Sequence, residues 1–124
     1  MLLTFQIGLI CAEPRLENRS NFPDSIFTAS NSIDNHTPEK ARLSSRSSWC
    51  TSSNVDNYLD IDFGVVYVIN SVTIFGDAVS KNWVTSYKLS YTSDGKNWIY
   101  GITGENKVYF MRFEKKLVYL SGIA

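Results

Sequence analysis

Residues 83–98 read WVTSYKLSYTSDGKNW, and this stretch decides the fold class of the 124-residue chain. Tyr87, Leu89 and Tyr91 alternate with small or charged residues, which is the period of a β-strand with one buried face. The SDGK tetrapeptide that follows has the composition of a tight turn. We therefore predict a β-hairpin whose second strand runs from residue 98 to residue 102.

Two more strands are expected before this hairpin. Leu59, Ile61 and Phe63 alternate with aromatic or acidic residues, and we expect Gly64 to end their strand. Residues 65–75 are an almost unbroken β-branched and aromatic run, typical of a strand that is paired centrally or buried on both faces. Because no segment shows a sustained helical period with a cap, the sequence predicts an all-β sandwich or barrel.

The chain before these strands is less regular. Residues 18–57 are dense in Ser, Asn, Asp, Thr and Pro, which predicts loops around one short strand near residues 25–29. Residues 1–12 are mostly apolar but too short to span a bilayer, which takes about 20 apolar residues. We interpret residues 1–10 as a candidate signal peptide or leader remnant that lacks a basic start.

The composition argues against several classes of function. Twelve Lys and Arg balance twelve Asp and Glu, so no net field attracts nucleic acid, and we expect no nucleic-acid partner. His36 is the only histidine, and with two distant cysteines it is insufficient for a four-ligand zinc site or a His-based metal cluster. The sequence therefore predicts a binding protein without metal or cofactor rather than an enzyme.

Six motifs carry a family resemblance: CAEPRLEN from Cys11, FPDSIFTAS from Phe22, PEKARL from Pro38, SWC from Ser48, YLDIDFG from Tyr58, and the hairpin at 83–98. In sequence and in order they resemble the discoidin family, the coagulation factor five/eight C-type domains. The resemblance covers residues 11–110 and implies a jelly-roll β-sandwich or distorted barrel. It also implies that loops at one end contact phospholipid, glycan, collagen or another protein, a choice that the fold alone does not make.

The family's last strands have no counterpart that we recognise, so we interpret residues 11–110 as an incomplete discoidin domain and residues 111–124 as a divergent tail. The tail could supply a substitute strand, and the missing strands would leave sheet edges and apolar faces exposed. The resemblance pairs Cys11 and Cys50 with cysteines of the missing segment. Both are therefore disulfide candidates whose partners are absent, and the chain is expected to be truncated.

By the resemblance, the candidate ligand-binding residues lie in the loops between strands: Asn31, Ile33, Asp34, His36, Arg46, Trp49, Asp77 and Lys81. Lipid-binding members expose large apolar residues in the first loop, where this chain offers only Ile33, so phospholipid is disfavoured. Positions that collagen-binding members use hold Ile33, Arg46 and Asp77, so collagen is disfavoured too. The remaining polar rim suits a glycan or protein ligand.

Two sets of residues have a structural interpretation beside the functional one. Asp60 and Asp62 share a strand face and could serve acid–base or metal chemistry, but a structural role on a polar outer face is favoured. For Trp49, together with the tryptophans at both ends of 83–98, packing is favoured over ligand contact.

Two glycosylation sequons, at Asn18 and Asn35, fit a secreted or cell-surface chain. We therefore predict an extracellular adhesion or recognition module that binds glycan or protein. The alternatives are a peripheral phospholipid-binding module or a non-functional fragment of a larger adhesion or receptor protein.

Overall fold

The structure is a computed structural model that describes residues 2–7, 16, 18–52, 57–77, 82–84, 86–101, 106–117 and 120–121. The elements in chain order are β1 (Leu2–Ile7), η2 (Asp24–Ile26), β2 (Phe27–Ala29), η3 (Pro38–Ala41), β3 (Asn57–Phe75), β4 (Asn82–Trp83), β5 (Ser86–Thr92), β6 (Ile99–Tyr100), β7 (Asn106–Leu117) and β8 (Leu120–Ser121). η2 and η3 are short 3-10 turns. The predicted all-β class, with the strand content of a discoidin sandwich, is confirmed.

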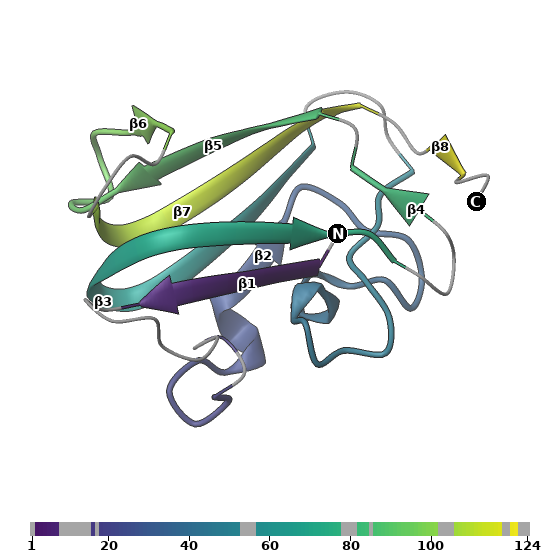
Figure 1. The fold of residues 1–124 in the computed structure, drawn as a ribbon, viewed down its shortest axis with the longest axis horizontal. Helices are drawn as coiled ribbons and strands as arrows, with labels where there is room; N and C mark the ends of the chain where they lie inside the picture. The colour runs from purple at the N-terminus through teal and green to yellow at the C-terminus, as the bar shows by residue number, and fades with distance from the viewer. Residues whose placement is uncertain are drawn as a thin grey trace.

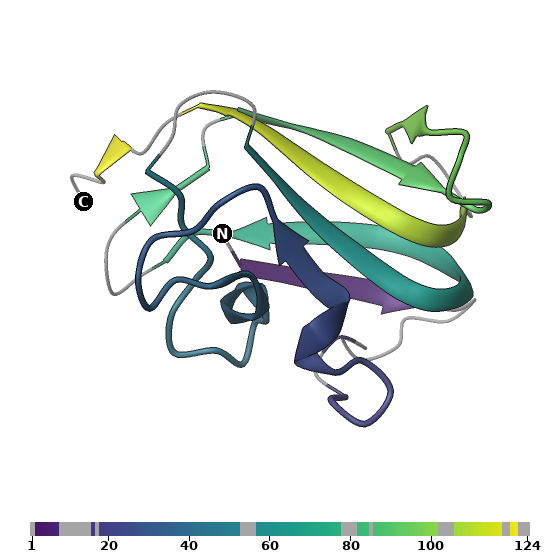
Figure 2. The same cartoon turned by 180° about the vertical axis from the view of Figure 1, so that it is seen from behind.

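Most strands join one antiparallel sheet. Its order is β1-β3-β7-β5-β6, with β2 paired to the first part of β3, while β4 and β8 form a separate pair. Figure 1 shows this sheet curled, with β1 below and β5 above, and Figure 2 shows η2 leading directly into β2 on the other side. Residues 2–7, inside the candidate leader, pair with residues 69–75 of β3.

The longest strand, β3, continues through Gly64, so the expected strand end at this residue is wrong. Gly64 has φ +77°, a left-handed conformation that glycine adopts without strain, and its N–H donates to Asp62 Oδ1 at 2.9 Å. The register against β7 slips here, from Asp62 opposite Phe110 to Tyr67 opposite Val108. The result is a bend that divides β3 into two arms, visible in Figure 1.

The bend also explains a second difference from expectation. Val65 and Val66 were expected in a buried strand, yet they are 57% and 48% exposed. They lie within the bulge, where the ladder to β7 is interrupted, so they project away from the paired sheet. The predicted strand is confirmed, since residues 67–69 pair with β7 and residues 69–75 pair with β1, but burial is wrong at Val65 and Val66.

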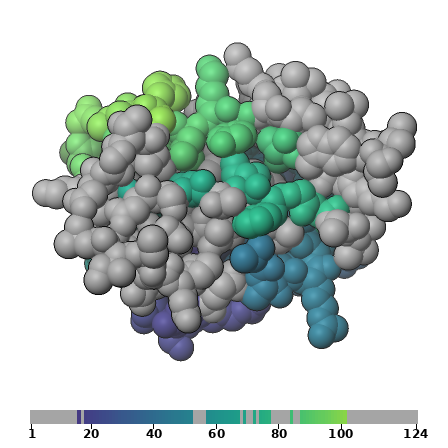
Figure 3. All heavy atoms as spheres, in the orientation of Figure 1, coloured from purple at the N-terminus to yellow at the C-terminus, as the bar shows by residue number. Residues whose placement is uncertain are grey.

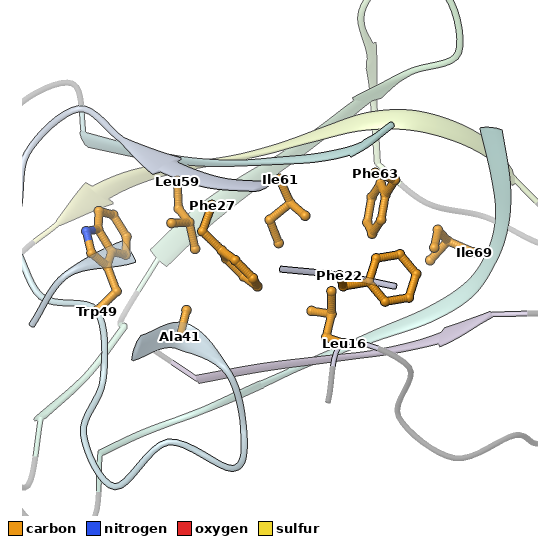
Figure 4. Packing of buried hydrophobic residues seen from close by; sticks show 9 residues of the cluster. All are labelled: Leu16, Phe22, Phe27, Ala41, Trp49, Leu59, Ile61, Phe63 and Ile69. Carbon is orange, nitrogen blue, oxygen red and sulfur yellow. The ribbon is translucent and has the colours of Figure 1, made fainter. Parts of the chain in front are cut away.

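The core lies between the sheet and a layer of irregular chain. Leu59, Ile61 and Phe63 are at most 5% exposed, which confirms the buried face predicted for that strand. Figure 4 shows the wider cluster, which comprises Leu16, Phe22, Phe27, Ala41, Trp49, Leu59, Ile61, Phe63 and Ile69. Phe22, Phe63 and Tyr67 form a group of rings with centroids 5.4–6.1 Å apart. Segments without strand structure therefore cover the sheet as its second layer.

Arg42 ties that irregular layer together. Its side chain is completely buried, and its guanidinium donates to the backbone carbonyls of Leu16 and Phe22 and, through Nε, to Asp24 Oδ1 at 3.0 Å. The guanidinium carbon also lies 4.8 Å from the centre of the Phe27 ring. One buried cation thus joins the segment before β2 to the end of η3.

The predicted hairpin is confirmed, with β6 shorter than expected. Ser90 pairs with Tyr100 and Tyr91 with Ile99, and β5 pairs with β7 on its other side. The predicted divergent tail begins inside β7, since residues 111–117 continue the strand that starts at Asn106 and lies between β3 and β5.

Candidate ligand-binding loops

Three loops meet at one end of the sheet. The Ile33 N–H donates to the Cys50 carbonyl at 3.0 Å, and the Cys50 N–H donates to the His36 carbonyl at 3.2 Å. These bonds pair residues 31–36 with residues 48–51 although neither segment is a strand. We call residues 31–36, residues 46–51 and Asp77 the loop network.

Asn31 is bound within this network. Its Nδ2 donates to Asn57 Oδ1 at 2.8 Å, its Oδ1 accepts the Thr51 hydroxyl, and its backbone carbonyl accepts Trp49 Nε1–H at 3.0 Å. Both ends of the amide are thus used to fix the loops against the start of β3. The contacts support a positioning role for this candidate ligand residue.

His36, Ser48, Cys50 and Asp77 form a compact polar cluster. His36 Nδ1 lies 2.9 Å from the Ser48 carbonyl, so Nδ1 carries a proton and donates it. The Ser48 hydroxyl donates to Asp77 Oδ2 at 2.6 Å and lies 3.3 Å from Cys50 Sγ. Ser48, Cys50 and Asp77 are at most 5% exposed, so of this cluster only His36 is within reach of a ligand.

Trp49 is 0% exposed and belongs to the core cluster, which supports the packing interpretation for this residue. Asp60 is 5% exposed and lies opposite Thr28 and Arg112 across the sheet, and Asp62 supports the Gly64 bend. These contacts fit structural roles for both carboxylates. The location of Asp60 differs from the polar outer face that we expected, because the side chain is buried.

The exposed part of the network is small and mostly polar. Ser32, Ile33, Asp34, Asn35 and Arg46 are exposed, Ile33 at 37%, and we call these five residues the polar rim. Asn35 has φ +64°, which an asparagine tolerates better than most residues, and this turn carries the rim outward. Among the remaining candidates, Lys81 and Cys11 lie outside the described residues.

Both sequon asparagines are exposed. Asn18 Oδ1 accepts the backbone N–H groups of Ser20 and Asn21 at 3.1 and 3.3 Å, and Asn35 lies in the polar rim. A glycan attached to either side chain would extend into solvent.

Sequence reasoning missed the residues that hold the loops in place. Arg42, Ser48 and Thr51 are buried and bonded over long separations, yet by type they resemble ordinary surface residues. The available signal was their place in or beside the PEKARL and SWC motifs. In both motifs the residue pattern indicates the family but does not indicate which polar groups the fold buries.

In the described part of the chain, no three His, Cys, Asp or Glu side chains come together in an arrangement able to hold a metal ion. The helical segments described here, η2 and η3, are far shorter than a membrane crossing requires.

Comparison with known proteins identifies similar chains. A family model described as F5/8 type C domain matches residues 26–118. The chain is 28% identical over 89 residues to neurexin-4 of Drosophila melanogaster, 33% over 84 residues to neuropilin-1 of Gallus gallus, and 36% over 80 residues to retinoschisin of Takifugu rubripes. These matches cover 71%, 61% and 59% of this chain, but only 6%, 9% and 29% of the respective relatives. The chain therefore corresponds to one small part of each relative.

Proposed function

Because the chain belongs to the F5/8 type C, or discoidin, domain family, we propose that it binds a glycan or protein ligand through its polar rim. The relatives are adhesion proteins or receptors that are extracellular or lie on the cell surface. This chain is an extracellular recognition module of the same kind. Binding, rather than catalysis, is the activity proposed.

The observation that carries this proposal is the contrast between the rim and its support. The five rim residues are exposed, whereas the side chains beneath them are buried and bonded to groups far away in the sequence. A polar surface on a fixed support binds with little loss of conformational entropy. Loops on a sheet scaffold are also common sites of recognition.

A phospholipid surface is a poorer fit to the same rim. Insertion into a bilayer interface is driven by burial of several apolar side chains, and Ile33, 37% exposed, is the apolar member of the rim. Asp34 beside it would approach anionic headgroups with the same sign of charge.

The test uses the whole chain secreted from eukaryotic cells and screened against immobilised glycans and extracellular protein ectodomains. Ile33→Ser and Asp34→Ala should each weaken binding of the captured ligand about tenfold, because each removes an exposed group at the rim. Lys96→Ala, in an exposed turn away from the rim, is the matched control and should bind normally.

Two outcomes would reject the proposal. One is equal loss of binding in Lys96→Ala, and the other is binding only to anionic vesicles in a sedimentation assay. Glycosidase treatment of the secreted chain should also lower its mass, with the shift removed by substituting both Asn18 and Asn35 with Gln.

A further inference from the structure

A hollow adjoins the polar rim and shares Arg46 with it. It has a volume of about 310 Å3 and is lined by Arg19, Asp24, Glu39, Lys40, Ser44, Ser45 and Arg46. We call it the basic pocket. In Figure 3 the surface near residue 20, in purple, and the surface near residue 40, in blue, adjoin along the lower edge of the molecule.

Its two carboxylates already have partners. Asp24 Oδ1 accepts a hydrogen bond from Arg42 at 3.0 Å, and Asp24 Oδ2 lies 3.5 Å from a guanidinium nitrogen of Arg19. Glu39 Oε1 accepts the Thr37 hydroxyl at 2.5 Å. One carboxylate is thus shared by two guanidinium groups, and the other has, among the residues that the structure describes, no partner at its second oxygen, Oε2.

Its cations are in excess. Arg19, Arg42, Lys40 and Arg46 line or back the pocket, against the two carboxylates. Among the residues that the structure describes, neither Lys40 nor Arg46 forms an ion pair. The whole chain has a formal net charge of zero, so this positive charge is local to the pocket. Because Arg42 is completely buried, water screens its charge less than that of a surface residue.

Hydroxyl chemistry completes the arrangement. Ser45 Oγ accepts the Ser47 N–H at 3.0 Å, which leaves its own proton for donation to a ligand. The pocket thus offers an ammonium and a guanidinium for an anion, a hydroxyl donor, and a carboxylate oxygen that accepts from a hydroxyl. An inorganic anion would use only the first two of these groups. A sugar that carries an acidic group would use all of them.

We propose that the basic pocket binds an acidic sugar, with the sulfate or carboxylate of the sugar between Lys40 and Arg46 and its hydroxyls against Glu39 and Ser45. Ligand pockets usually measure about 300–1,000 Å3, so this one suits a single sugar unit. The inference rests on the proposed function, because it assigns a class of glycan to an extracellular recognition module, but it places that glycan in a pocket that shares only Arg46 with the rim.

The experiment compares three ligands that share one scaffold: lactose, sialylated lactose and sulfated lactose, titrated calorimetrically into the whole chain. Sialylated or sulfated lactose should bind at least tenfold more tightly than lactose, and raised salt should weaken that binding. Whichever acidic form binds identifies the source of the anion. Lys40→Gln should lower the affinity about tenfold, since it removes one charged contact. Lys96→Gln makes the same change of charge in a distant exposed turn and should leave the affinity unchanged.

Four results would overturn the inference. The first two are that lactose binds as tightly as its acidic forms and that Lys96→Gln lowers the affinity as much as Lys40→Gln. The other two are that free sulfate displaces the acidic sugar at an equal concentration and that neither acidic sugar binds. The proposed function can be judged separately, because Asp34→Ala should disturb ligand capture at the rim and leave the acidic sugars bound. A chain that captures a protein through the rim but binds no acidic sugar would refute the pocket alone.

Discussion

The turn between β5 and β6 and the loop network are both polar, but they are held in different ways. In the turn, Asp94 Oδ1 accepts the backbone N–H groups of Lys96 and Asn97 at 2.7 and 2.8 Å, so the bonds span two or three residues. The loop network also contains bonds between residues far apart in sequence, such as His36 to Ser48, 12 residues apart, and Ser48 to Asp77, 29 apart. The turn can form from its own sequence, whereas the network needs the folded sheet. Changes in the network should therefore cost more stability.

The largest expected effect is at Trp49, where the network meets the core. Trp49→Ala should lower the free energy of unfolding by about 3–5 kcal/mol, because it leaves a cavity where a completely buried ring packs. Urea denaturation followed by tyrosine fluorescence or circular dichroism measures this.

Ile33→Ala, in the exposed rim, is the control and should change stability by less than about 0.5 kcal/mol. If Trp49→Ala were as stable as the control yet failed to bind ligand, Trp49 would be a ligand-contacting residue and its packing role would be rejected.

Arg42 should give the next largest effect. Arg42→Met keeps much of the apolar volume but removes every donor, which leaves the carbonyls of Leu16 and Phe22 without this partner. The free energy of unfolding should fall by about 2–4 kcal/mol, because these two carbonyls lose the donors that Arg42 supplied. Arg42→Lys should recover only part of this loss, because one ammonium group does not reproduce the fork of a guanidinium. Full recovery by Lys would show that charge alone, without the directed bonds, stabilises this region.

The same contrast explains which parts of the fold the sequence could reveal. The hairpin at 83–98 and the buried face of Leu59 and Ile61 follow from alternation within a few residues, and both are confirmed. The bend at Gly64 was misjudged, because a glycine in a strand pattern predicts either an end or a bulge. Only pairing with β7, more than 40 residues later, decides between them.

The candidate site was less predictable than the fold. The family motifs indicated the correct loops, but Trp49 and Asp77 proved to be buried while Ile33 and Asp34 are exposed. Whether a loop side chain is exposed depends on which way it turns, and a loop has no alternating sequence pattern that predicts this. The basic pocket could not be predicted for the same reason, since Arg19 and Arg46 line one pocket only in the folded chain, where Arg42 bonds to Asp24.

A smaller effect is expected inside the loop network at Ser48. Ser48→Ala removes the hydroxyl that donates to Asp77 Oδ2, and a buried acceptor that loses a donor should cost about 1–3 kcal/mol. A double-mutant cycle with Asp77→Asn, read by urea denaturation, isolates the pair. Additive effects of the two substitutions would mean that the 2.6 Å contact contributes no coupling.

The smallest effect should appear in the turn, and it should depend on pH. The backbone N–H groups of Asn97 and Lys96, followed by the side chains of Asn97 and Thr92, hold the pKa of Asp94 well below its usual value of 3.8. A carboxyl whose pKa is lower in the folded state binds its proton more readily when unfolded. It therefore stabilises the fold above about pH 4, and that contribution is lost as the pH falls toward the folded-state pKa.

Asp94→Asn should remove this contribution, so the difference in unfolding free energy between the native chain and the variant should be greatest near neutral pH and shrink below about pH 4. Urea denaturation at a series of pH values measures the difference directly. Ser93→Ala, in the same turn but without a change of charge, should differ from the native chain by a constant amount over that range. A constant difference for Asp94→Asn as well would mean that the Asp94 charge does not stabilise the turn. The turn would then depend on the neutral hydrogen bonds of Thr92 and on Gly95, whose φ of +76° suits a glycine.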